Sequence, residues 1–317
     1  MCDTTPVMIV HGGAWAIPDD LAEASVNGVK KAVCAGYQVL LQGAAAVDAV
    51  EAAVCMLEDD PAFDAGTGSV LNFDGEVEMD AVIMDGHDLR AGAVACVQNI
   101  AHPVKLARMV MDKTDHVLIV GKGANQFAKE MRVETVPTEK LVTEEAVREL
   151  EYYRKYKSTV NSLFKTRDDV LGHDTVGAVA LDCMGNLAFA TSTGGISAKR
   201  PGRVGDAPII GCGGYADSKV GGVSTTGHGE AIMKICLAKN IIHFMEQGLS
   251  PQEASESALR SMAERVSGSG GVITISNHGN VGKHFTTERM AWAWLKEGQM
   301  HYGLNPGEDF VTQYSVQ

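Results

Sequence analysis

Pairs of short apolar segments joined by glycine turns constrain the fold of this chain more than any other feature. The segment TVGAVALD turns at Met184-Gly185 into NLAFATSTGG, and GGVITIS and NVGKHFTT flank a turn at His278-Gly279. Runs rich in Val, Ile, Thr and Phe between turn residues predict antiparallel strand pairs. Helical periodicity is grouped between these pairs and does not alternate strictly with single strands. The pattern therefore favours an α+β protein with layered antiparallel sheets over a doubly wound parallel sheet.

The remaining segments fit this scheme. We expect further strands at PVMIVHGG, AGAVACV, HVLIVG and VGGVSTTG, and a hairpin around the turn dipeptide Asp74-Gly75. Apolar residues recur with helical spacing in several other segments. These predict helices at 21–42, 44–57, 102–114, 143–157, 230–247 and 251–266. With 317 residues, 45% of them hydrophobic, the chain has a core for one large domain or two modest ones.

Charge and composition exclude several classes of function. The formal net charge is −13 and no basic cluster occurs, so nucleic acid and anionic membranes are not expected partners. The N-terminus lacks the pattern of a signal peptide, and no apolar run is long enough to span a membrane. Seven scattered cysteines without CxxC spacing, and no glycosylation sequon, indicate reduced thiols. We expect a cytoplasmic protein.

Three short motifs suggest other chemistry but are incomplete. GKGANQ follows an expected strand as a dinucleotide loop does, yet Gln126 stands where the third glycine is needed. His11-Gly12-Gly13 resembles the oxyanion loop of serine hydrolases, but the chain has no G-x-S-x-G elbow. The pair His228 and Glu230 has no His/Cys cluster to complete a metal site.

A threonine at the head of one strand is a candidate nucleophile. Thr175 follows His173-Asp174 directly and opens the run VGAVAL. On its own, an ordinary strand start is the better explanation of this arrangement, because Thr and Val both favour strands. A second threonine, Thr193, ends the partner strand, and counting from the turn at Met184-Gly185 puts the two threonines at neighbouring ladder positions. Two hydroxyls are therefore predicted side by side.

Two later segments suggest a site for a small zwitterion. Arg203 and Asp206 lie three residues apart in a glycine-flanked loop. They form a local ion pair in the simplest interpretation. In the functional interpretation, Arg203 binds the α-carboxylate of a small zwitterion and Asp206 binds its α-ammonium group. The segment STTGHGE, residues 224–230, brings hydroxyls and backbone N–H groups to a helix N-terminus, a place suited to a developing oxyanion.

Taken together, these motifs resemble the plant-type N-terminal-nucleophile asparaginases, also called isoaspartyl peptidases. HDTVGAVALD, ATSTGG, GRVGD and STTGHGE match that family in order and spacing, as do HGGA and LEDDPAFDAGTGSVLNFDGEVEMDA. The resemblance covers nearly the whole chain. It implies one domain, residues 1–317, folded as a four-layer αββα sandwich of the N-terminal nucleophile hydrolase type. It also implies a precursor cut between Asp174 and Thr175 into an α chain (1–174) and a β chain (175–317).

The resemblance further implies an activity and a role for each site residue. The enzyme would hydrolyse L-asparagine to L-aspartate and ammonia and remove N-terminal β-aspartyl residues from dipeptides, without a catalytic cofactor. Thr175 would be the nucleophile and its own α-amine, with a pKa of about 7.7–8.0, the base. The other implied roles are orientation of Thr175 by Thr193, substrate binding by Arg203, Asp206 and the Gly229 backbone, and oxyanion stabilisation by Thr226 and the Gly227 N–H.

A structural ion and an assembly are also implied. The family has a sodium loop of backbone carbonyls, and its counterparts here are Leu57, Glu58, Asp60, Phe63, Ala65 and Thr67. A dimer of αβ units is the implied assembly. One position departs from the family pattern: Asp64 stands where the family usually has Asn. A carboxylate near the nucleophile would raise the pKa of the Thr175 amine and slow maturation.

Three alternatives remain at this point. A glycosylasparaginase shares the HDT motif, but it belongs in a lysosome, and neither signal peptide nor sequon is found here. A threonine endopeptidase fits less well, because the Arg203/Asp206 pair suits the end of a free amino acid. The third alternative is an uncleaved scaffold protein that has kept the fold.

Overall fold

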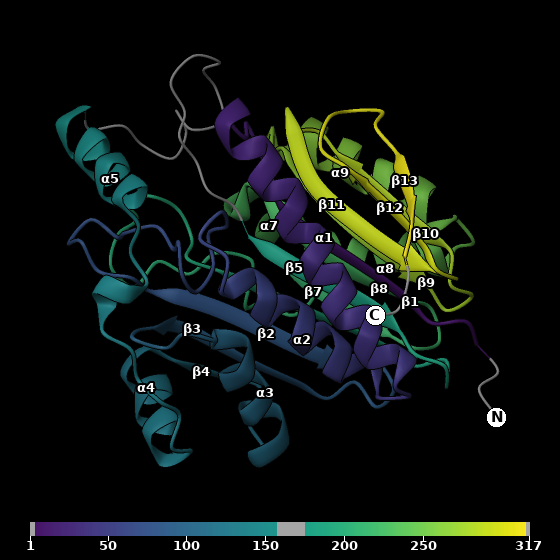
Figure 1. Cartoon of the computed structure of the whole chain (residues 1–317), viewed down its shortest axis with the longest axis horizontal. Helices are drawn as coiled ribbons and strands as arrows, with labels where there is room; N and C mark the ends of the chain where they lie inside the picture. The colour runs from purple at the N-terminus through teal and green to yellow at the C-terminus, as the bar shows by residue number, and fades with distance from the viewer. Residues whose placement is uncertain (1–3, 157–174, 315–317) are drawn as a thin grey trace.

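Two β-sheets form the centre of the fold in the computed structural model, which describes residues 4–156 and 175–314 (Figure 1). The larger sheet has nine strands, and its spatial order is β13 (Phe310–Gln313), β12 (Gln299–Gly303), β11 (Arg289–Lys296), β1 (Val7–Trp15), β5 (Val176–Leu181), β6 (Leu187–Thr193), β2 (Met79–Asp85), β3 (Ala91–Val97) and β4 (Leu118–Val120). The smaller sheet has four strands, in the order β10 (Val281–Phe285), β9 (Gly270–Ser276), β8 (Gly221–Gly227) and β7 (Gly214–Asp217).

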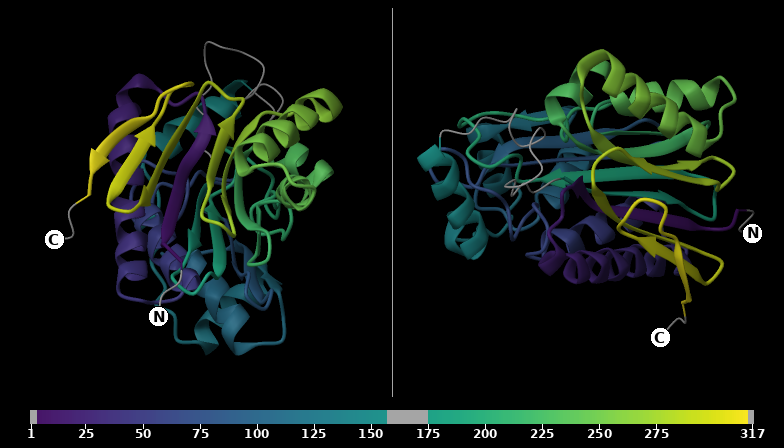
Figure 2. Two further views of the ribbon diagram at one scale, coloured as in Figure 1. Left: turned by 90° about the vertical axis from the view of Figure 1, so that its right-hand side faces the viewer. Right: turned by 90° about the horizontal axis from the view of Figure 1, so that it is seen from above.

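Helices cover the outer faces of these sheets. The larger sheet carries α1 (Asp19–Leu41), α2 (Ala46–Glu58) and α3 (Pro103–Lys113), and the smaller sheet carries α7 (Gly229–Ile235), α8 (Leu237–Glu246) and α9 (Pro251–Val266). Figure 2 shows the strands between these two groups of helices in its right-hand view. After β4 the chain continues through α4 (Gly121–Glu130), a 3-10 turn (Thr138–Lys140) and α5 (Glu144–Tyr156). No helix of residues 4–156 and 175–314 is long and apolar enough to cross a membrane.

The central strands are buried on both faces because each side of the larger sheet has its own core. Successive side chains of a strand point to opposite faces. In β1, Met8 and Val10 pack with the helices α1 to α3, while Val7 and Ile9 pack against the smaller sheet. A third core lies between the smaller sheet and its helices. This explains the near-continuous apolar runs that mark these strands in the sequence. The expectation of an α+β protein is confirmed.

Most strand pairs are antiparallel, as the sequence predicts. The turn at Met184-Gly185 is present, with the Asp182 N–H donating to the Asn186 carbonyl at 3.0 Å. The strands that it joins pair from Leu181 opposite Leu187 to Val176 opposite Ser192. One pair differs: β3 and β4 are parallel and are connected through α3.

Two predicted elements are wrong in their extent. Asp74-Gly75 does form a turn, but β2 pairs with β3 and β6 instead of with the segment before that turn. No hairpin forms here because the Asn72 side-chain oxygen accepts the N–H groups of Asp74 and Glu76 at 3.0 and 2.9 Å. These local bonds compete with the bonds between strands that a hairpin would need. The single helix expected over 230–247 is two helices, α7 and α8. They are separated by Cys236, whose φ of 50° lies in the left-handed region.

Candidate active site

Thr175 lies at the head of β5, between β1 and β6, and only 5% of its surface is exposed. Because Val176 pairs with Ser192, the same register continued by one residue puts Thr175 opposite Thr193. The Thr193 hydroxyl oxygen accepts the Gly195 N–H at 2.9 Å. The two threonines thus meet as the hairpin register predicts. Asp174, the other half of the predicted cleavage site, lies outside the described residues.

The smaller sheet brings Thr226 to the same place. This side chain is fully buried on β8, and its Oγ1 donates to the Thr175 carbonyl oxygen at 3.1 Å. The next residue, Gly227, has φ 128°, and a Cβ there would lie 2.4 Å from the Gly270 Cα. Only glycine fits that position, which carries the chain from β8 into α7. Thr175 and Thr226 are thus neighbours although they come from different sheets.

A buried histidine, to which no sequence motif assigns a role, lies behind this pair. His11 on β1 is fully buried, and its Nε2 lies 2.7 Å from the Ser224 Oγ on β8. Burial lowers the pKa of His11 to about 3, although the Thr175 backbone opposes the shift. A Cβ at Gly177 would lie 2.5 Å from this Nε2, so the glycine admits the imidazole between the sheets. His11 is therefore neutral at physiological pH and positions strands β1, β5 and β8. The HGGA motif was the only signal for it.

The guanidinium of Arg203 has a partner that the sequence did not reveal. Its Nε and Nη2 donate to the two carboxylate oxygens of Glu230, in the first turn of α7, at 3.0 and 2.9 Å. Burial disfavours ionisation of Glu230, but Arg203 outweighs it and holds the carboxyl pKa below its usual value. Glu230 uses two of the five N–H groups that an arginine offers. The pair fixes the plane of the guanidinium while leaving donors for a second anion.

The side chains of Asp206 and Arg203 both closely approach Gly229. Asp206 is buried, and its Oδ2 accepts the Thr225 hydroxyl at 3.4 Å. A Cβ built on Gly229 would lie 2.8 Å from the Asp206 Oδ1 and 3.0 Å from the Arg203 Nη2. A cationic and an anionic group therefore lie close to one position, which a residue with a side chain could not occupy without a clash.

Asp64 lies against the end of β6. Its backbone carbonyl accepts the Gly194 N–H at 2.9 Å, and its Oδ1 accepts the Val70 N–H at 2.9 Å. A carboxamide oxygen could accept the same side-chain bond, so an Asn would also fit this contact. A second acid is nearby: Glu149 on α5 is buried, and its pKa is raised to about 8, mainly by burial and also by Asp64. No sequence signal distinguished Glu149 from the other acids of its charged helix.

The segment after α2 forms a tight loop, where the sequence predicts sodium. The Glu58 carbonyl accepts the Thr67 N–H at 2.7 Å, and the Asp60 carbonyl accepts the Phe63 N–H at 3.1 Å. Gly66 has φ 57°, and a Cβ there would lie 2.3 Å from the Glu58 carbonyl oxygen. The loop therefore folds closely around its own carbonyl groups. Each carbonyl oxygen keeps a second lone pair beyond these bonds.

Comparison with known proteins places the chain among the hydrolases. The family model described as Asparaginase matches residues 4–304, and the chain belongs to that family. A Xenopus laevis protein named isoaspartyl peptidase/L-asparaginase is 52% identical over 97% of both chains. A Homo sapiens protein of the same name is 50% identical over 97% of this chain and 98% of its own. The Danio rerio protein of that name is 49% identical over 96% of this chain and 97% of its own.

Proposed function

We propose that this protein hydrolyses L-asparagine to L-aspartate and ammonia and removes N-terminal β-aspartyl residues from dipeptides. The observation that carries the proposal is the position of Arg203 and Asp206 on either side of Gly229. They would bind the α-carboxylate and the α-ammonium group of one amino acid. The names of the relatives, each about half identical along nearly the full chain, support the same activity.

The proposal includes a fold and a maturation step. We infer a four-layer αββα sandwich of the N-terminal nucleophile hydrolase type, which the three cores on and between the sheets support. The chain would be one domain, made as a precursor of residues 1–317 and cut between Asp174 and Thr175 into chains 1–174 and 175–317. The position of Thr175 at the head of a buried strand supports this, since a free amine there would sit inside the site.

In the reaction that we propose, the Thr175 hydroxyl attacks the β-carbonyl carbon of the substrate. Its own α-amine takes the hydroxyl proton and later gives it to the departing ammonia or amine. Thr193 would orient the nucleophile, since the register of the hairpin puts it opposite Thr175. Water then cleaves the acyl-enzyme ester and releases aspartate. No cofactor is required for these steps.

The oxyanion would be stabilised by Thr226 and the Gly227 N–H. Thr226 has a single hydroxyl proton, and here the Thr175 carbonyl accepts it at 3.1 Å. The Thr226 hydroxyl must therefore rotate from that carbonyl toward the substrate oxygen after cleavage. The same hydroxyl can then serve two purposes in turn: it holds the head of β5 before substrate binds, and it stabilises negative charge during the reaction.

A substrate panel tests the proposed function. We expect L-asparagine and β-Asp-Phe to be hydrolysed, because both present free α-groups to Arg203 and Asp206. The α-linked dipeptide α-Asp-Phe should fail, because its scissile carbonyl occupies the place of the free carboxylate. L-Glutamine should be poorer by on the order of a hundredfold, because its extra methylene displaces the carbonyl from Thr175. The measurement is kcat/KM for each compound on the matured enzyme.

Other outcomes of this panel point to other functions. Preference for N4-glycosylated asparagine would favour a glycosylasparaginase. Turnover of α-Asp-Phe as fast as of β-Asp-Phe would contradict the roles given to Arg203 and Asp206. An assembly of two αβ units and a cytoplasmic location complete the proposal, and light scattering and cell fractionation test them.

We also propose a structural sodium ion bound by backbone carbonyls of the loop after α2. The candidate residues are Leu57, Glu58, Asp60, Phe63, Ala65 and Thr67. Replacement of sodium by tetramethylammonium at equal ionic strength should lower the Tm by on the order of a few degrees, because an ion that binds only the folded state stabilises it. Potassium, which is larger, should restore the Tm only partly. Equal Tm values in all three salts would contradict the site.

A further inference from the structure

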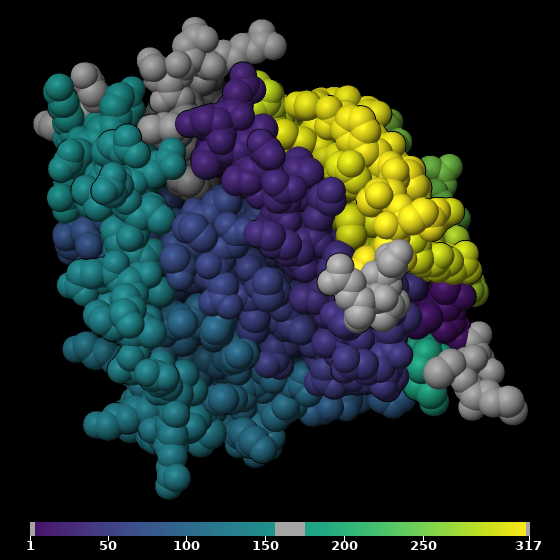
Figure 3. Space-filling view, in the orientation of Figure 1, coloured from purple at the N-terminus to yellow at the C-terminus, as the bar shows by residue number. Residues whose placement is uncertain are grey.

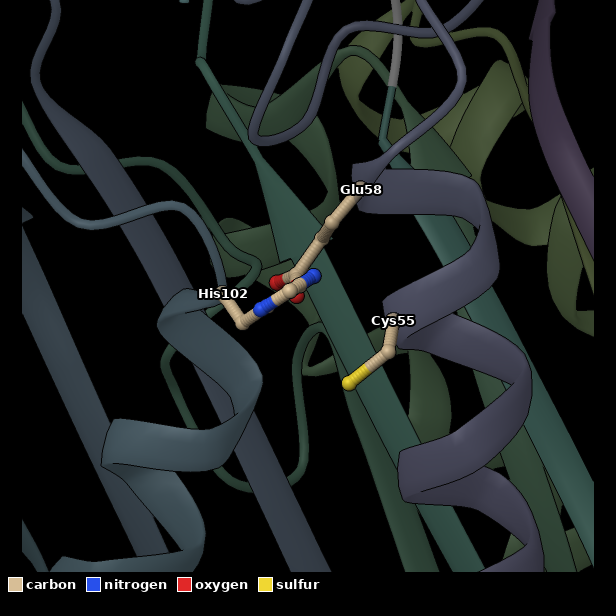
Figure 4. A group of neighbouring side chains, drawn as sticks. All are labelled: Cys55, Glu58 and His102. Carbon is tan, nitrogen blue, oxygen red and sulfur yellow. The ribbon is translucent and has the colours of Figure 1, made fainter. Parts of the chain in front are cut away.

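Three side chains that commonly bind metals converge on one side of α2, outside the residues assigned above to catalysis (Figure 4). Cys55 and Glu58 belong to the last turn of α2, and His102 immediately precedes α3. One ligand atom from each lies within 4.8 Å of the other two. Cys55 and Glu58 are three residues apart in a helix and therefore share a face. The cluster is composed of a sulfur, an oxygen and a nitrogen donor.

Glu58 supplies an independent indication that a ligand belongs here. Its carboxyl group is fully buried, and its Oε1 accepts the Val104 N–H at 3.0 Å in the first turn of α3. That bond explains one oxygen as a cap of the helix. The other oxygen, Oε2, has no hydrogen-bond partner in the described part of the chain. A hydrogen bond from the Ser192 hydroxyl would lower the carboxyl pKa, yet neither Ser192 Oγ nor Glu58 Oε2 has a partner within hydrogen-bonding geometry.

Burial disfavours the ionised forms of Glu58 and Cys55, which a bound cation would favour. Burial raises the pKa of Glu58 to about 8, and burial together with Glu58 raises the pKa of the Cys55 thiol. Helix capping accounts for neither the thiol nor the second carboxyl oxygen. A bound divalent cation would stabilise the ionised form of both groups.

A carboxylate, that of Asp59, lies beside the His102 ring. The ring Nε2 lies 2.9 Å from the Oδ1 of Asp59, the residue that follows Glu58. A histidine that binds a metal usually donates its other ring N–H to such a carboxylate, which fixes the tautomer. With zinc bound at Nδ1, Nε2 would carry the proton and donate it to Asp59. The His102 side chain is 25% exposed and that of Asp59 59%, so an ion can enter from this side.

We propose that Cys55, Glu58 and His102 bind one Zn²⁺ ion. Zinc takes this mixture of sulfur, nitrogen and oxygen donors, whereas Mg²⁺ and Ca²⁺ prefer oxygen alone. Bonds of about 2.0–2.3 Å put tetrahedral ligand atoms about 3.5 Å apart, so the three side chains must close by about 1 Å. Binding releases the thiol proton, because the thiolate is the form that binds a metal, and a water molecule completes the four ligands.

This zinc site is distinct from the proposed sodium site, although both involve Glu58. Sodium would be held by the Glu58 backbone carbonyl, and zinc by its side chain. The zinc ion would join the end of α2 to the beginning of α3. Because the loop that carries Asp64 begins directly after α2, the ion would also restrain the start of that loop.

Cobalt is the probe for this proposal, because Co²⁺ bound to a thiolate absorbs visibly and in the near ultraviolet. Titration of the full-length, metal-free protein with Co²⁺ should show one equivalent with a thiolate-to-cobalt band, which Zn²⁺ removes. Cys55→Ser should abolish the band, and His102→Gln should weaken binding strongly. Asp59 is exposed, and Asp59→Asn leaves all three ligands in place. Because it removes the carboxylate that orients His102, it should weaken Zn²⁺ binding by about 10- to 100-fold. Cys236→Ser removes a thiol that is exposed on the described part of the chain, and it should change neither the band nor the affinity.

Two results would overturn the site. One is a titration in which the wild-type protein gives no thiolate-to-cobalt band. The other is a band that survives Cys55→Ser and Asp59→Asn but disappears in Cys236→Ser, which would assign the metal to the exposed thiol. Asparagine hydrolysis by the metal-free protein is measured in parallel. This activity shows that each variant is folded. The zinc proposal makes no prediction about it, so loss of activity and loss of metal binding can be told apart.

Discussion

Thr175→Ala should leave the protein as one uncut chain and lower kcat/KM for L-asparagine by on the order of 10⁴-fold or more. Both effects follow from one atom, because the hydroxyl that opens the peptide bond before Thr175 would be the hydroxyl that later attacks the substrate. The wild-type protein should resolve on a denaturing gel into pieces 1–174 and 175–317. Thr175→Ser keeps a hydroxyl and should still be cut, more slowly.

The matched control for this substitution is Thr274→Ala. Thr274 is also a fully buried strand threonine, but it lies on β9 and its hydroxyl donates to the Pro251 carbonyl in the core under α9. The Thr274→Ala protein should still cleave itself and remain active, with some loss of stability. End-sequencing of the smaller wild-type piece decides the mechanism, since any first residue other than Thr175 would refute it.

Arg203→Ala should weaken substrate binding by about 2–5 kcal/mol, since it leaves a buried substrate carboxylate without its partner. That loss corresponds to a KM raised by about 30- to 5000-fold. Arg203→Lys should restore only part of it, because an ammonium group lacks the planar fork of donors. Self-cleavage should continue in both variants, because no substrate is bound in that step. The measurements are KM and kcat for L-asparagine and β-Asp-Phe.

Glu230→Gln separates substrate binding from the orientation of Arg203. Arg203→Ala also leaves Glu230 without its partner, because the Glu230 carboxylate accepts two hydrogen bonds from the guanidinium. Glu230→Gln keeps the charge of Arg203 and removes only its partner, so it should raise KM less than Arg203→Ala does. Equal losses in the two variants would mean that orientation, and not the charge, is the contribution of Arg203. Unchanged KM in Arg203→Ala would remove the residue from the site.

The sequence predicts those parts of the fold that depend on residues close together in the chain. The hairpin of β5 and β6 follows from a glycine turn and a two-residue period, and these fix the register that puts Thr193 opposite Thr175. The order of strands does not follow from such signals. β1 lies between β11 and β5, and this pairing joins segments from opposite ends of the chain. Strands β7, β11, β12 and β13 were not anticipated at all.

The candidate site shows the same division. The sequence predicts roles for Arg203, Asp206, Thr226 and Gly227 because each belongs to a short motif. Glu230 was within one of those motifs, but its pairing with Arg203 depends on how α7 lies over the preceding loop. The proximity of Glu149 to Asp64 depends on the packing of α5, and no pattern in the sequence encodes it. The break at Cys236 was missed because left-handed backbone there is not signalled by a glycine.

The strand order has a consequence for the pieces that the proposed cut would produce. In the larger sheet, β1 and β2 come from residues 1–174, while their neighbours β11, β5 and β6 come from residues 175–317. Separation would have to break the ladders β11–β1, β1–β5 and β6–β2 and expose strands that are buried on both faces. Dilution therefore would not release one piece as a folded subunit. The two chains would form an interlocked heterodimer that unfolds as one cooperative unit, so that dissociation and unfolding are the same event.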